Sequence, residues 1–195
     1  MLNHHLEQMA NIIWQRDFKN RKTNGTLGDI ALISSGKRPS IKQSELSTFI
    51  NIPILGASSI MGYTSESLYS EKILVTGRVG THGVIQRYNR PCWPSDNTLV
   101  LKSDSYELVY QILKNIDYQS MNRGSTQPLI TQTDLKKISI FIPNKDELKK
   151  FENTIGIFMK QYESNILENE NLVELRDTLL PKLMSGDILV SQATK

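Results

Sequence analysis

The sequence predicts an α+β fold, in which one globular domain of short strands and few helices is followed by a long C-terminal α-helix. Residues 21–143 alternate short β-forming runs with Gly, Pro, Ser and Asn, which is typical of a domain built from many short strands. From residue 144 onward, apolar side chains recur at three- and four-residue spacing, which indicates a helix. A helix this long has to bury its apolar stripe against a second helix, so we expect an antiparallel coiled coil.

The long helix carries its own start and stop signals. Asn144 can cap the N-terminus, and Glu147 completes a capping box three residues later. Pro181 is expected to stop or kink the helix, and Gly186 is expected to form the final cap. At 1.5 Å per residue the helical run is about 55 Å long. The apolar residues expected to contact the partner helix are Leu148, Phe151, Ile155, Tyr162, Ile166, Leu172 and Leu179.

A second amphipathic stripe lies in residues 1–20, which we interpret as the tail of a preceding helical repeat or as a helix packing on the arm formed by residues 144–195. Four of its residues match four in the arm at a constant offset of 166: Asn3, Leu6, Met9 and Ile13 correspond to Asn169, Leu172, Leu175 and Leu179. Together with the family resemblance described below, the match suggests that the arm packs antiparallel against another copy of itself. Asn165 and Asn169 interrupt the stripe and are the polar positions expected to set its register.

The domain at 21–143 is predicted to contain six strands and one clear helix. The helix is expected at 106–116, where apolar residues have helical spacing. The loops between the strands are rich in small polar residues, and loops of this kind commonly carry function. The predicted strands are at 27–33, 52–55, 73–75, 83–86, 98–101 and 138–142.

The net charge of +3 is unevenly distributed along the chain. Residues 20–143 contain fourteen basic and nine acidic residues, whereas residues 144–195 contain seven basic and nine acidic residues. This division fits a central domain that meets phosphate and an arm that does not. Chance stays open as an alternative, since a modest positive excess is common in proteins that never bind nucleic acid.

The composition of the chain indicates its cellular compartment and argues against several kinds of site. Cys92 is the single cysteine, so no internal disulfide can form and a reducing cytoplasm is expected. No apolar run approaches the length of a membrane span, and no signal-peptide pattern is present. One cysteine and the three histidines, His4, His5 and His82, do not have the spacing of a zinc site, and no metal site is predicted.

Catalysis is the weaker interpretation of the central domain. The glycines at 77, 80 and 83 do not have the spacing of a dinucleotide-binding loop, and no Walker A sequence exists. Asp96 resembles the start of a nuclease motif, but Val100 stands where the second acid would be required. We therefore predict no catalytic residues.

Three loops concentrate side chains suited to DNA. Arginine can bind guanine through two hydrogen bonds, and glutamine suits adenine, so Arg78, Arg123 and Gln127 are the candidates for base reading. For each loop the alternative is an ordinary solvated turn. The remaining candidates, which we expect to bind phosphates or bases, are Lys37, Arg38, Thr81, His82, Ser125 and Thr126.

Several short motifs in this order resemble the specificity (S) subunits of type I restriction-modification systems. Thr-Leu-Gly-Asp-Ile at 26–30, followed by Ser35-Gly36, is similar to the start of the family's target recognition domain. Gly-Arg-Val-Gly at 77–80 and Trp-Pro-Ser-Asp-Asn at 93–97 resemble the middle of that domain. Residues 124–128 and 135–143 resemble its end, and residues 179–188 are similar to the end of the family's long helical region.

The resemblance implies a target recognition domain at 21–143 that binds double-stranded DNA and has no catalytic activity. It implies that the chain reads one half of a bipartite target and recruits the methyltransferase (M) and restriction (R) subunits. S-adenosylmethionine, ATP and magnesium would belong to those partners, so no cofactor is expected here. Two alternatives stay open: a coiled-coil adaptor that does not bind DNA, and a nucleic-acid-modifying enzyme.

The chain departs from the family in one respect. Full-length members carry two recognition domains and two long helices, whereas this chain carries one of each. The departure implies a half-length form, either a half-subunit that pairs with a second copy or another S half, or the C-terminal half of a longer protein.

Overall fold

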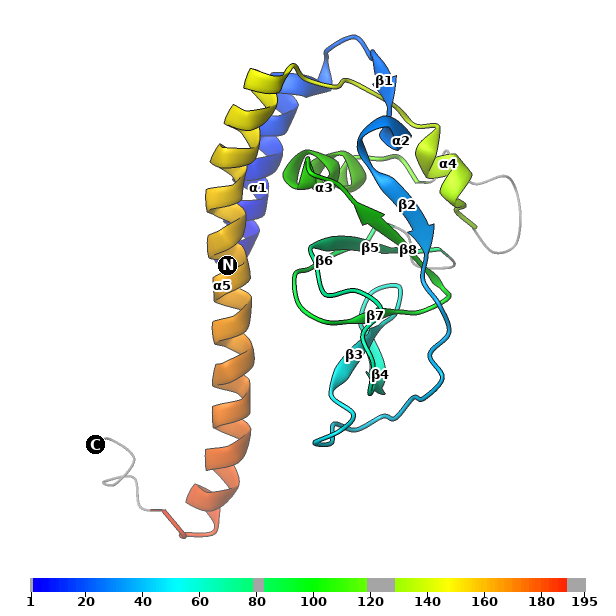
Figure 1. Ribbon diagram of the computed structural model, residues 1–195. Coiled ribbons are helices and arrows are strands. Elements are labelled where there is room, and N and C mark those ends of the chain that lie inside the picture. The colour runs from blue at the N-terminus through cyan, green and yellow to red at the C-terminus, as the bar shows by residue number, and fades with distance from the viewer. Residues whose placement is uncertain (1, 79–82, 119–128, 189–195) are drawn as a thin grey trace. The chain divides into compact units, whose positions relative to one another are not determined.

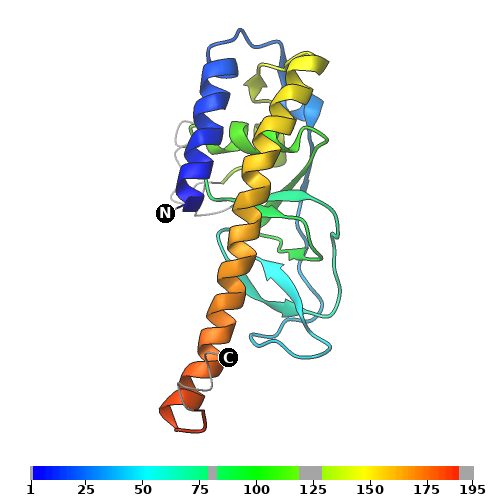
Figure 2. The ribbon, with the colours of Figure 1, turned by 90° about the vertical axis from the view of Figure 1, so that its left-hand side faces the viewer.

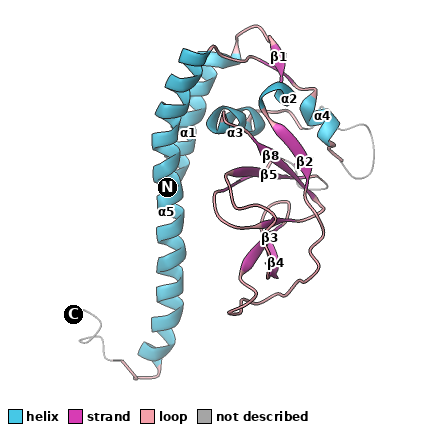
Figure 3. Ribbon diagram, viewed as in Figure 1, coloured by secondary structure: helices cyan, strands magenta, loops and turns pink. Residues whose placement is uncertain are grey.

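A computed structural model describes residues 2–78, 83–118 and 129–188 (Figure 1). The chain forms two compact units, Ile12–Asn153 and Met1–Asn11 together with Thr154–Lys195. Every strand among the described residues belongs to the first unit (Figure 3). The combination of a strand-rich unit and a long C-terminal helix confirms the predicted α+β class. No helix among the described residues is long and apolar enough to cross a membrane.

The strand-rich unit is built around a four-stranded antiparallel sheet of order β2-β8-β5-β6. Its strands are β2 (Leu32–Ser35), β8 (Thr98–Lys102), β5 (Ile73–Gly77) and β6 (Ile85–Tyr88). A three-stranded sheet of order β4-β3-β7 contains an antiparallel β3–β4 pair and a parallel β3–β7 pair. Its strands are β3 (Ile52–Leu55), β4 (Ile60–Thr64) and β7 (Trp93–Pro94). A two-stranded ladder joins β1 (Gly25–Thr26) to β9 (Ser139–Ile140).

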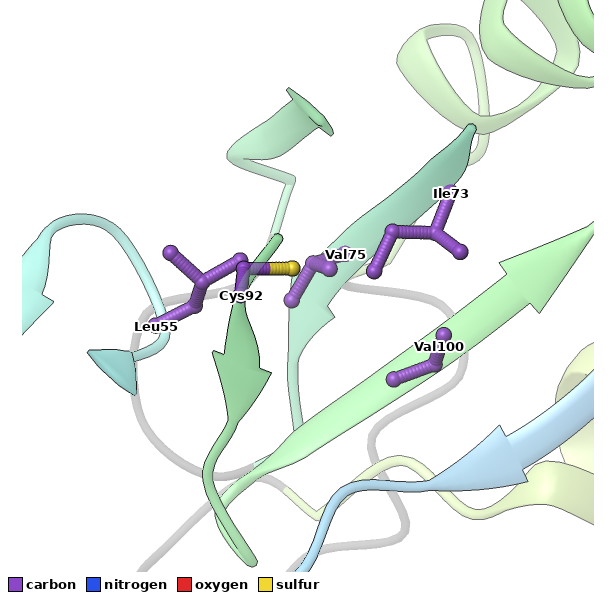
Figure 4. Packing of buried hydrophobic residues seen from close by; sticks show 5 residues of the cluster. All are labelled: Leu55, Ile73, Val75, Cys92 and Val100. Carbon is purple, nitrogen blue, oxygen red and sulfur yellow. The ribbon is translucent and has the colours of Figure 1, made fainter. Parts of the chain in front are cut away.

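The core between these sheets is apolar and tightly packed. All five residues of β5 are buried, which explains why it begins with three consecutive apolar residues, Ile73–Val75, and does not alternate apolar and polar residues. A cluster in this core joins the two larger sheets (Figure 4), and its members are Leu55, Ile73, Val75, Cys92 and Val100. Burial raises the pKa of the Cys92 thiol to about 12, so this cysteine is a packing residue and not a reactive thiol.

Helix α3 (Tyr106–Lys114) is the most buried helix element of this unit, since every residue before Lys114 is buried. It confirms the helix predicted at 106–116, although it ends two residues earlier. Strand β3 matches the prediction in both bounds, and β5 and β8 extend the predicted runs slightly. Strand β6 begins two residues after the predicted start, and β9 covers only the centre of the run predicted at 138–142.

The strand predicted at 27–33 is wrong in its first half. Residues Leu27–Ile30 form the helical turn α2, because Asp29 accepts hydrogen bonds from the backbone nitrogen and the hydroxyl of Thr26, at 2.7 and 2.9 Å. This reciprocal cap favours a helical start over an extended strand. The same Thr-x-x-Asp arrangement, with Thr131 and Asp134, begins α4 (Gln132–Lys136), which was not predicted.

Helix α5 (Lys145–Met184) is 40 residues long, about 60 Å at 1.5 Å per residue. Its capping box is confirmed: the Asn144 Oδ1 accepts from the Glu147 backbone nitrogen at 3.0 Å, and the Glu147 carboxylate accepts from the Asn144 nitrogen at 3.2 Å. Pro181 lies inside the helix and does not stop it, contrary to one of the two expected outcomes. Gly186 has a φ of +79°, which confirms the predicted cap.

In the second unit, the beginning of α1 (Leu2–Trp14) runs antiparallel to α5 (Figure 2). The Asn165 side chain donates to the Asn3 Oδ1 at 2.7 Å, and the Asn3 amide donates to the Tyr162 carbonyl at 3.3 Å. Asn165 therefore pairs with a helix of its own chain. The antiparallel coiled coil with another copy stays a prediction.

The 166-residue correspondence between α1 and the end of α5 fails at one buried position. Ala10 is fully buried in α1, but its counterpart in α5 is the exposed Arg176. An arginine cannot replace a fully buried alanine without severe crowding. The correspondence therefore covers the polar and outer apolar positions of α1 and does not make the two segments interchangeable.

Candidate nucleic-acid interface

The last residues of β2 and β5 and the first residues of β8 lie together at one end of the four-stranded sheet. We call this end of the sheet the loop edge. Ser35, the last residue of β2, pairs with Leu99, and Gly77, the last residue of β5, pairs with Thr98 at the start of β8. Because these neighbours are antiparallel, the loops that follow β2 and β5 leave from the edge where the turn before β8 arrives. Two of the three loops predicted to contact DNA, those beginning at Ser34 and Arg78, are thus brought together from positions more than forty residues apart.

The loop after β2 is held against the β7–β8 turn by its backbone. The Gly36 nitrogen donates to the Thr98 carbonyl at 3.1 Å, and the Lys37 nitrogen donates to the Pro94 carbonyl at 3.0 Å. The Trp93 indole donates in turn to the Lys37 carbonyl at 2.7 Å. These bonds fix the backbone of the loop, while the Lys37 and Arg38 side chains remain exposed.

Gly36 is required by this close approach. A Cβ atom at this position would lie only 2.5 Å from the Pro94 carbonyl oxygen and still closer to that of Ser95. Backbone atoms cannot yield as a flexible side chain would. The glycine noted in the sequence as allowing close backbone approach therefore brings the Lys37 loop against the turn.

Arg78 lies at the centre of the same edge, directly after β5. Its backbone nitrogen donates to the Asn97 carbonyl at 2.9 Å, and its carbonyl accepts from the Ile130 nitrogen at 3.0 Å. The side chain is partly buried, and its Nε has no hydrogen-bond partner among the described residues. The binding role of Arg78 stays a prediction.

The chain returns to this edge at α4. The Gln132 side-chain amide lies 2.9 Å from the Ser35 hydroxyl, and the Ile130 nitrogen binds Arg78 as described above. Ile130 and Gln132, which come directly after the third predicted loop in the sequence, therefore contact the starts of the other two loops. Six predicted site residues lie outside the described residues, and their roles stay predictions: Thr81, His82, Arg123, Ser125, Thr126 and Gln127.

The turn between β7 and β8 is the part of this edge that the predicted DNA-contact residues omit. Its exposed residues are Asp96 and Asn97, which lie between the Lys37 loop and Arg78. The sequence places Asp96 in an incomplete nuclease motif and in the Trp-Pro-Ser-Asp-Asn motif at 93–97, but neither pattern predicts a DNA contact for it. The available signal was the Pro-Ser-Asp-Asn composition, which is typical of a turn that presents polar side chains.

Not every cation of the unit is available for binding. The Arg87 guanidinium forms a two-point ion pair with the Glu107 carboxylate, at 2.6 and 2.8 Å, and only about 5% of its side chain is exposed. It also lies 4.8 and 4.7 Å from the rings of Tyr106 and Tyr110. Arg87 is therefore a structural residue, whereas Lys37, Arg38 and Arg78 lie at the loop edge.

The beginning of α5 is fastened to α3 by one carboxylate. Glu152 accepts hydrogen bonds from the backbone nitrogens of Glu107 and Leu108, at 3.1 and 2.9 Å, and thus caps the N-terminal end of α3. Burial raises the pKa of Glu152 despite these two bonds, which lower it. Phe151 packs beside it, with its ring centroid 5.0 Å from that of Phe18.

A pocket of about 340 Å³ lies between the chain segment leading to β1, the end of α3 and β9. Its walls are mainly aromatic and aliphatic, and the Arg21 guanidinium covers the Phe141 ring at 5.2 Å. No group of three or more His, Cys, Asp or Glu within the described parts of the chain is arranged to hold a metal. The lining residues are Trp14, Phe18, Lys19, Arg21, Thr23, Ile112, Asn115, Ile116, Asp117, Ile138, Ser139, Ile140 and Phe141.

The predicted interaction stripe on α5 divides into a buried and an exposed part. Phe151 and Ile155 are buried, and Leu172 is 54% exposed. The remaining predicted positions have intermediate burial, and they are Leu148, Tyr162, Ile166 and Leu179. The exposed part of the stripe has the apolar surface that a further helix would cover.

Known proteins resemble this chain over most of its length. The family described as "Type I restriction modification DNA specificity domain" matches residues 20–176. The HindI specificity subunit of Haemophilus influenzae is 27% identical over 186 residues, which cover 83% of this chain and 40% of that protein. The MjaIX specificity subunit of Methanocaldococcus jannaschii is 31% identical over 87 residues, or 45% of this chain and 20% of that protein.

Solved structures share the fold. The S subunit of the type I restriction-modification system from M. genitalium aligns with a TM-score of 0.64 at 18% identity, covering 93% of this chain and 52% of that one. A chain from a structure described as the basis of complex assembly and conformational transition in the type I R-M system aligns with a TM-score of 0.55 at 17% identity. That alignment covers 95% of this chain and 53% of the other.

This chain therefore spans about half the length of the two solved chains and less than half of the specificity subunits it matches. The family match covers far more than half of its own residues and includes nearly all of the strand-rich unit and most of α5. The chain belongs to the type I restriction-modification DNA specificity domain family.

Proposed function

We propose that this chain is a DNA-specificity subunit that reads one half of a bipartite target in double-stranded DNA. The observation that supports it most is the meeting of the Lys37 loop, Arg78 and the β7–β8 turn at one edge of the sheet. Backbone hydrogen bonds hold these segments in a defined arrangement. Cations with exposed or unsatisfied groups and anchored backbones are what a DNA-reading surface requires.

The side chains divide between positioning and reading. Lys37 and Arg38 are exposed, and their long side chains suit contacts to phosphates, which would position the domain without reading sequence. Arg78 is more constrained and suits a two-point contact with guanine. The candidates outside the described residues, including Arg123 and Gln127, extend this proposal to the loop at 122–128.

The proposal assigns no chemistry to the chain itself. Methylation and cleavage would be performed by M and R subunits, which would bring S-adenosylmethionine, ATP and magnesium. The chain would recruit them, and its long helix would supply a surface for assembly. The specificity subunits and the type I system named among its relatives support this division of labour.

We further propose that two copies, or this chain and another S half, pair through the exposed part of α5. Leu172, Leu175 and Leu180 are each at least half exposed on this helix. Apolar side chains repeated along a helix in this way favour burial against a second helix. Two identical readers related by a twofold axis would recognise a palindromic bipartite site.

Methylation mapping in cells that express this chain with its methyltransferase partner tests the proposal. We expect a modified bipartite motif, and a palindromic one if the chain pairs with itself. Removing seven residues from the exposed part of α5 should change the spacer and leave the half-sites unaltered. An unchanged spacer would contradict our proposal that the length of α5 sets the distance between the two half-sites.

Binding measurements with the purified chain distinguish a DNA reader from a coiled-coil adaptor. A coiled-coil adaptor would show no salt-dependent affinity for DNA, either alone or with methyltransferase partners. A DNA reader should lose affinity steeply as salt rises, because its cations displace counterions from the duplex.

A further inference from the structure

We propose that the β7–β8 turn reads the DNA sequence directly, with the Asn97 amide bonding to a base edge next to the one contacted by Arg78. This inference rests on the proposed DNA-binding function and assigns a reading residue that the predicted set omits. Three observations carry it: the rigidity of the turn, its place between the two basic segments, and the chemistry of its exposed side chains.

The turn is held at both ends. The Ser95 nitrogen donates to the Leu55 carbonyl at 2.9 Å, which ties the turn to β3. The Thr98 nitrogen and hydroxyl both donate to the Ser95 carbonyl, at 3.0 and 2.7 Å. Ser95 and Thr98 are buried, so the two residues between them project from a fixed base. A reading group on such a support loses little conformational freedom on binding.

The turn lies between the two segments already argued to meet DNA. On one side, Pro94 accepts from the Lys37 nitrogen, and on the other the Asn97 carbonyl accepts from the Arg78 nitrogen at 2.9 Å. The backbones of Asn97 and Arg78 are therefore in direct contact. Because successive base pairs are about 3.4 Å apart, two side chains leaving from touching backbones reach the same or neighbouring base pairs.

The exposed side chains suit base edges better than phosphates. The Asn97 amide carries a donor and an acceptor, the pair that matches N7 and the N6 amino group of adenine. The Asn97 side chain is exposed. Asp96 has only acceptors when ionised, so it is repelled by phosphate and can accept from the amino group of cytosine. The neighbouring Lys37 and Arg38 provide the attraction to the backbone.

The test compares Asn97→Ala with Asn51→Ala in the full chain, on the duplex identified by methylation mapping and on duplexes with each base pair substituted in turn. Asn51 is an exposed asparagine just before β3, and Leu55 at the other end of β3 holds the turn. We expect Asn97→Ala to weaken binding to the identified duplex roughly 10-fold or more. It should also abolish discrimination at one base pair, while affinity for random DNA and the thermal unfolding midpoint stay unchanged. Asn51→Ala should change none of these.

A second variant gives an independent result. Asp96→Asn removes the repulsion between the turn and phosphate. The affinity of this variant for random DNA at low salt should therefore rise several-fold. An equal loss of affinity by Asn97→Ala on every duplex would reduce Asn97 to a backbone contact and overturn the proposal. Unchanged binding by Asn97→Ala would also overturn it and leave the DNA-binding function standing. Absence of sequence-specific binding by the unaltered chain would overturn both.

Discussion

The strand-rich unit treats its basic side chains in two opposite ways. In the interior, Arg87 is almost completely buried and forms a two-point ion pair with Glu107 beneath two tyrosine rings. At the loop edge, Lys37 and Arg38 are exposed, and the Nε of Arg78 has no hydrogen-bond partner within 2–78, 83–118 and 129–188. At the loop edge, hydrogen bonds therefore fix the backbone, while the cationic groups are left available for a ligand.

This difference separates stability from binding within one unit. A buried charge that loses its partner is strongly destabilising, whereas an exposed charge contributes little to folding. The positive excess of residues 20–143 thus includes cations that cannot meet DNA, and Arg87 is one of them. Substitutions in the two regions should move different measurements.

The largest effect is expected for Arg87→Ala, which leaves the Glu107 carboxylate buried without its partner. The free energy of unfolding should fall by about 3–5 kcal/mol, measured by urea denaturation of the full chain. Lys102→Ala is the matched control, because its ion pair with Glu71 is exposed to solvent and should contribute far less to stability. Similar losses for the two variants would contradict the distinction between buried and exposed cations.

Gly36→Ala should show that the backbone of the loop edge is as closely packed as the interior. The added methyl group meets two carbonyl oxygens that cannot move independently, so the cost should be about 1–3 kcal/mol in unfolding free energy. Specific DNA binding should fall as well, since the Lys37 loop has to shift away from the β7–β8 turn. Gly156→Ala is the control, because a Cβ at that position meets nothing within 4 Å. Loss of stability without any change in DNA binding would separate the loop from the reading surface.

Glu152→Gln should change how stability depends on pH. Burial raises the pKa of Glu152 above its ordinary value of 4.5, so the folded state binds this proton more tightly than the unfolded state does. The contribution of Glu152 is therefore most favourable at acid pH and declines as the pH rises through its unfolded and folded pKa values. Urea denaturation between pH 4 and 7 should show the variant gaining relative to the unaltered chain. A constant difference across this range would show that the carboxyl does not titrate differently on folding.

The smallest effect on folding is expected for Lys37→Ala, the exposed counterpart of Arg87. Its unfolding free energy should change by no more than about 0.5 kcal/mol. Its DNA affinity should fall similarly on all sequences, and the slope of affinity against salt should decrease by about one phosphate contact. A loss confined to one base pair of the target would instead make Lys37 a reading residue.

Local signals in the sequence account for much of the secondary structure. The capping box at Asn144, the cap at Gly186 and the β3 run were all predictable because each depends on residues within a few positions of one another. The same kind of signal was present but not used at Thr26 and Thr131, where an aspartate three residues later begins a short helix. The helix through Pro181 shows the limit of such signals, since the first missing hydrogen bond did not end α5.

The buried roles of charged residues were less predictable. Arg87 and Glu107 are twenty residues apart and form a pair only because β6 lies beside α3. Glu152 caps a helix that begins more than forty residues earlier in the chain. Neither relation follows from the spacing of residues along the sequence, because both depend on which elements pack together.

The sequence by itself determined the α+β class, the long helix and the family, and it predicts the loops most suited to DNA. These depend on composition, short-range capping and ordered motifs, which remain readable without the fold. Tertiary structure decided that Lys37, Arg78 and the turn carrying Asn97 share one edge, and that Asn165 pairs with Asn3. Those contacts join residues from about twenty to more than one hundred and sixty positions apart, and only strand register and helix packing bring such residues within hydrogen-bond distance.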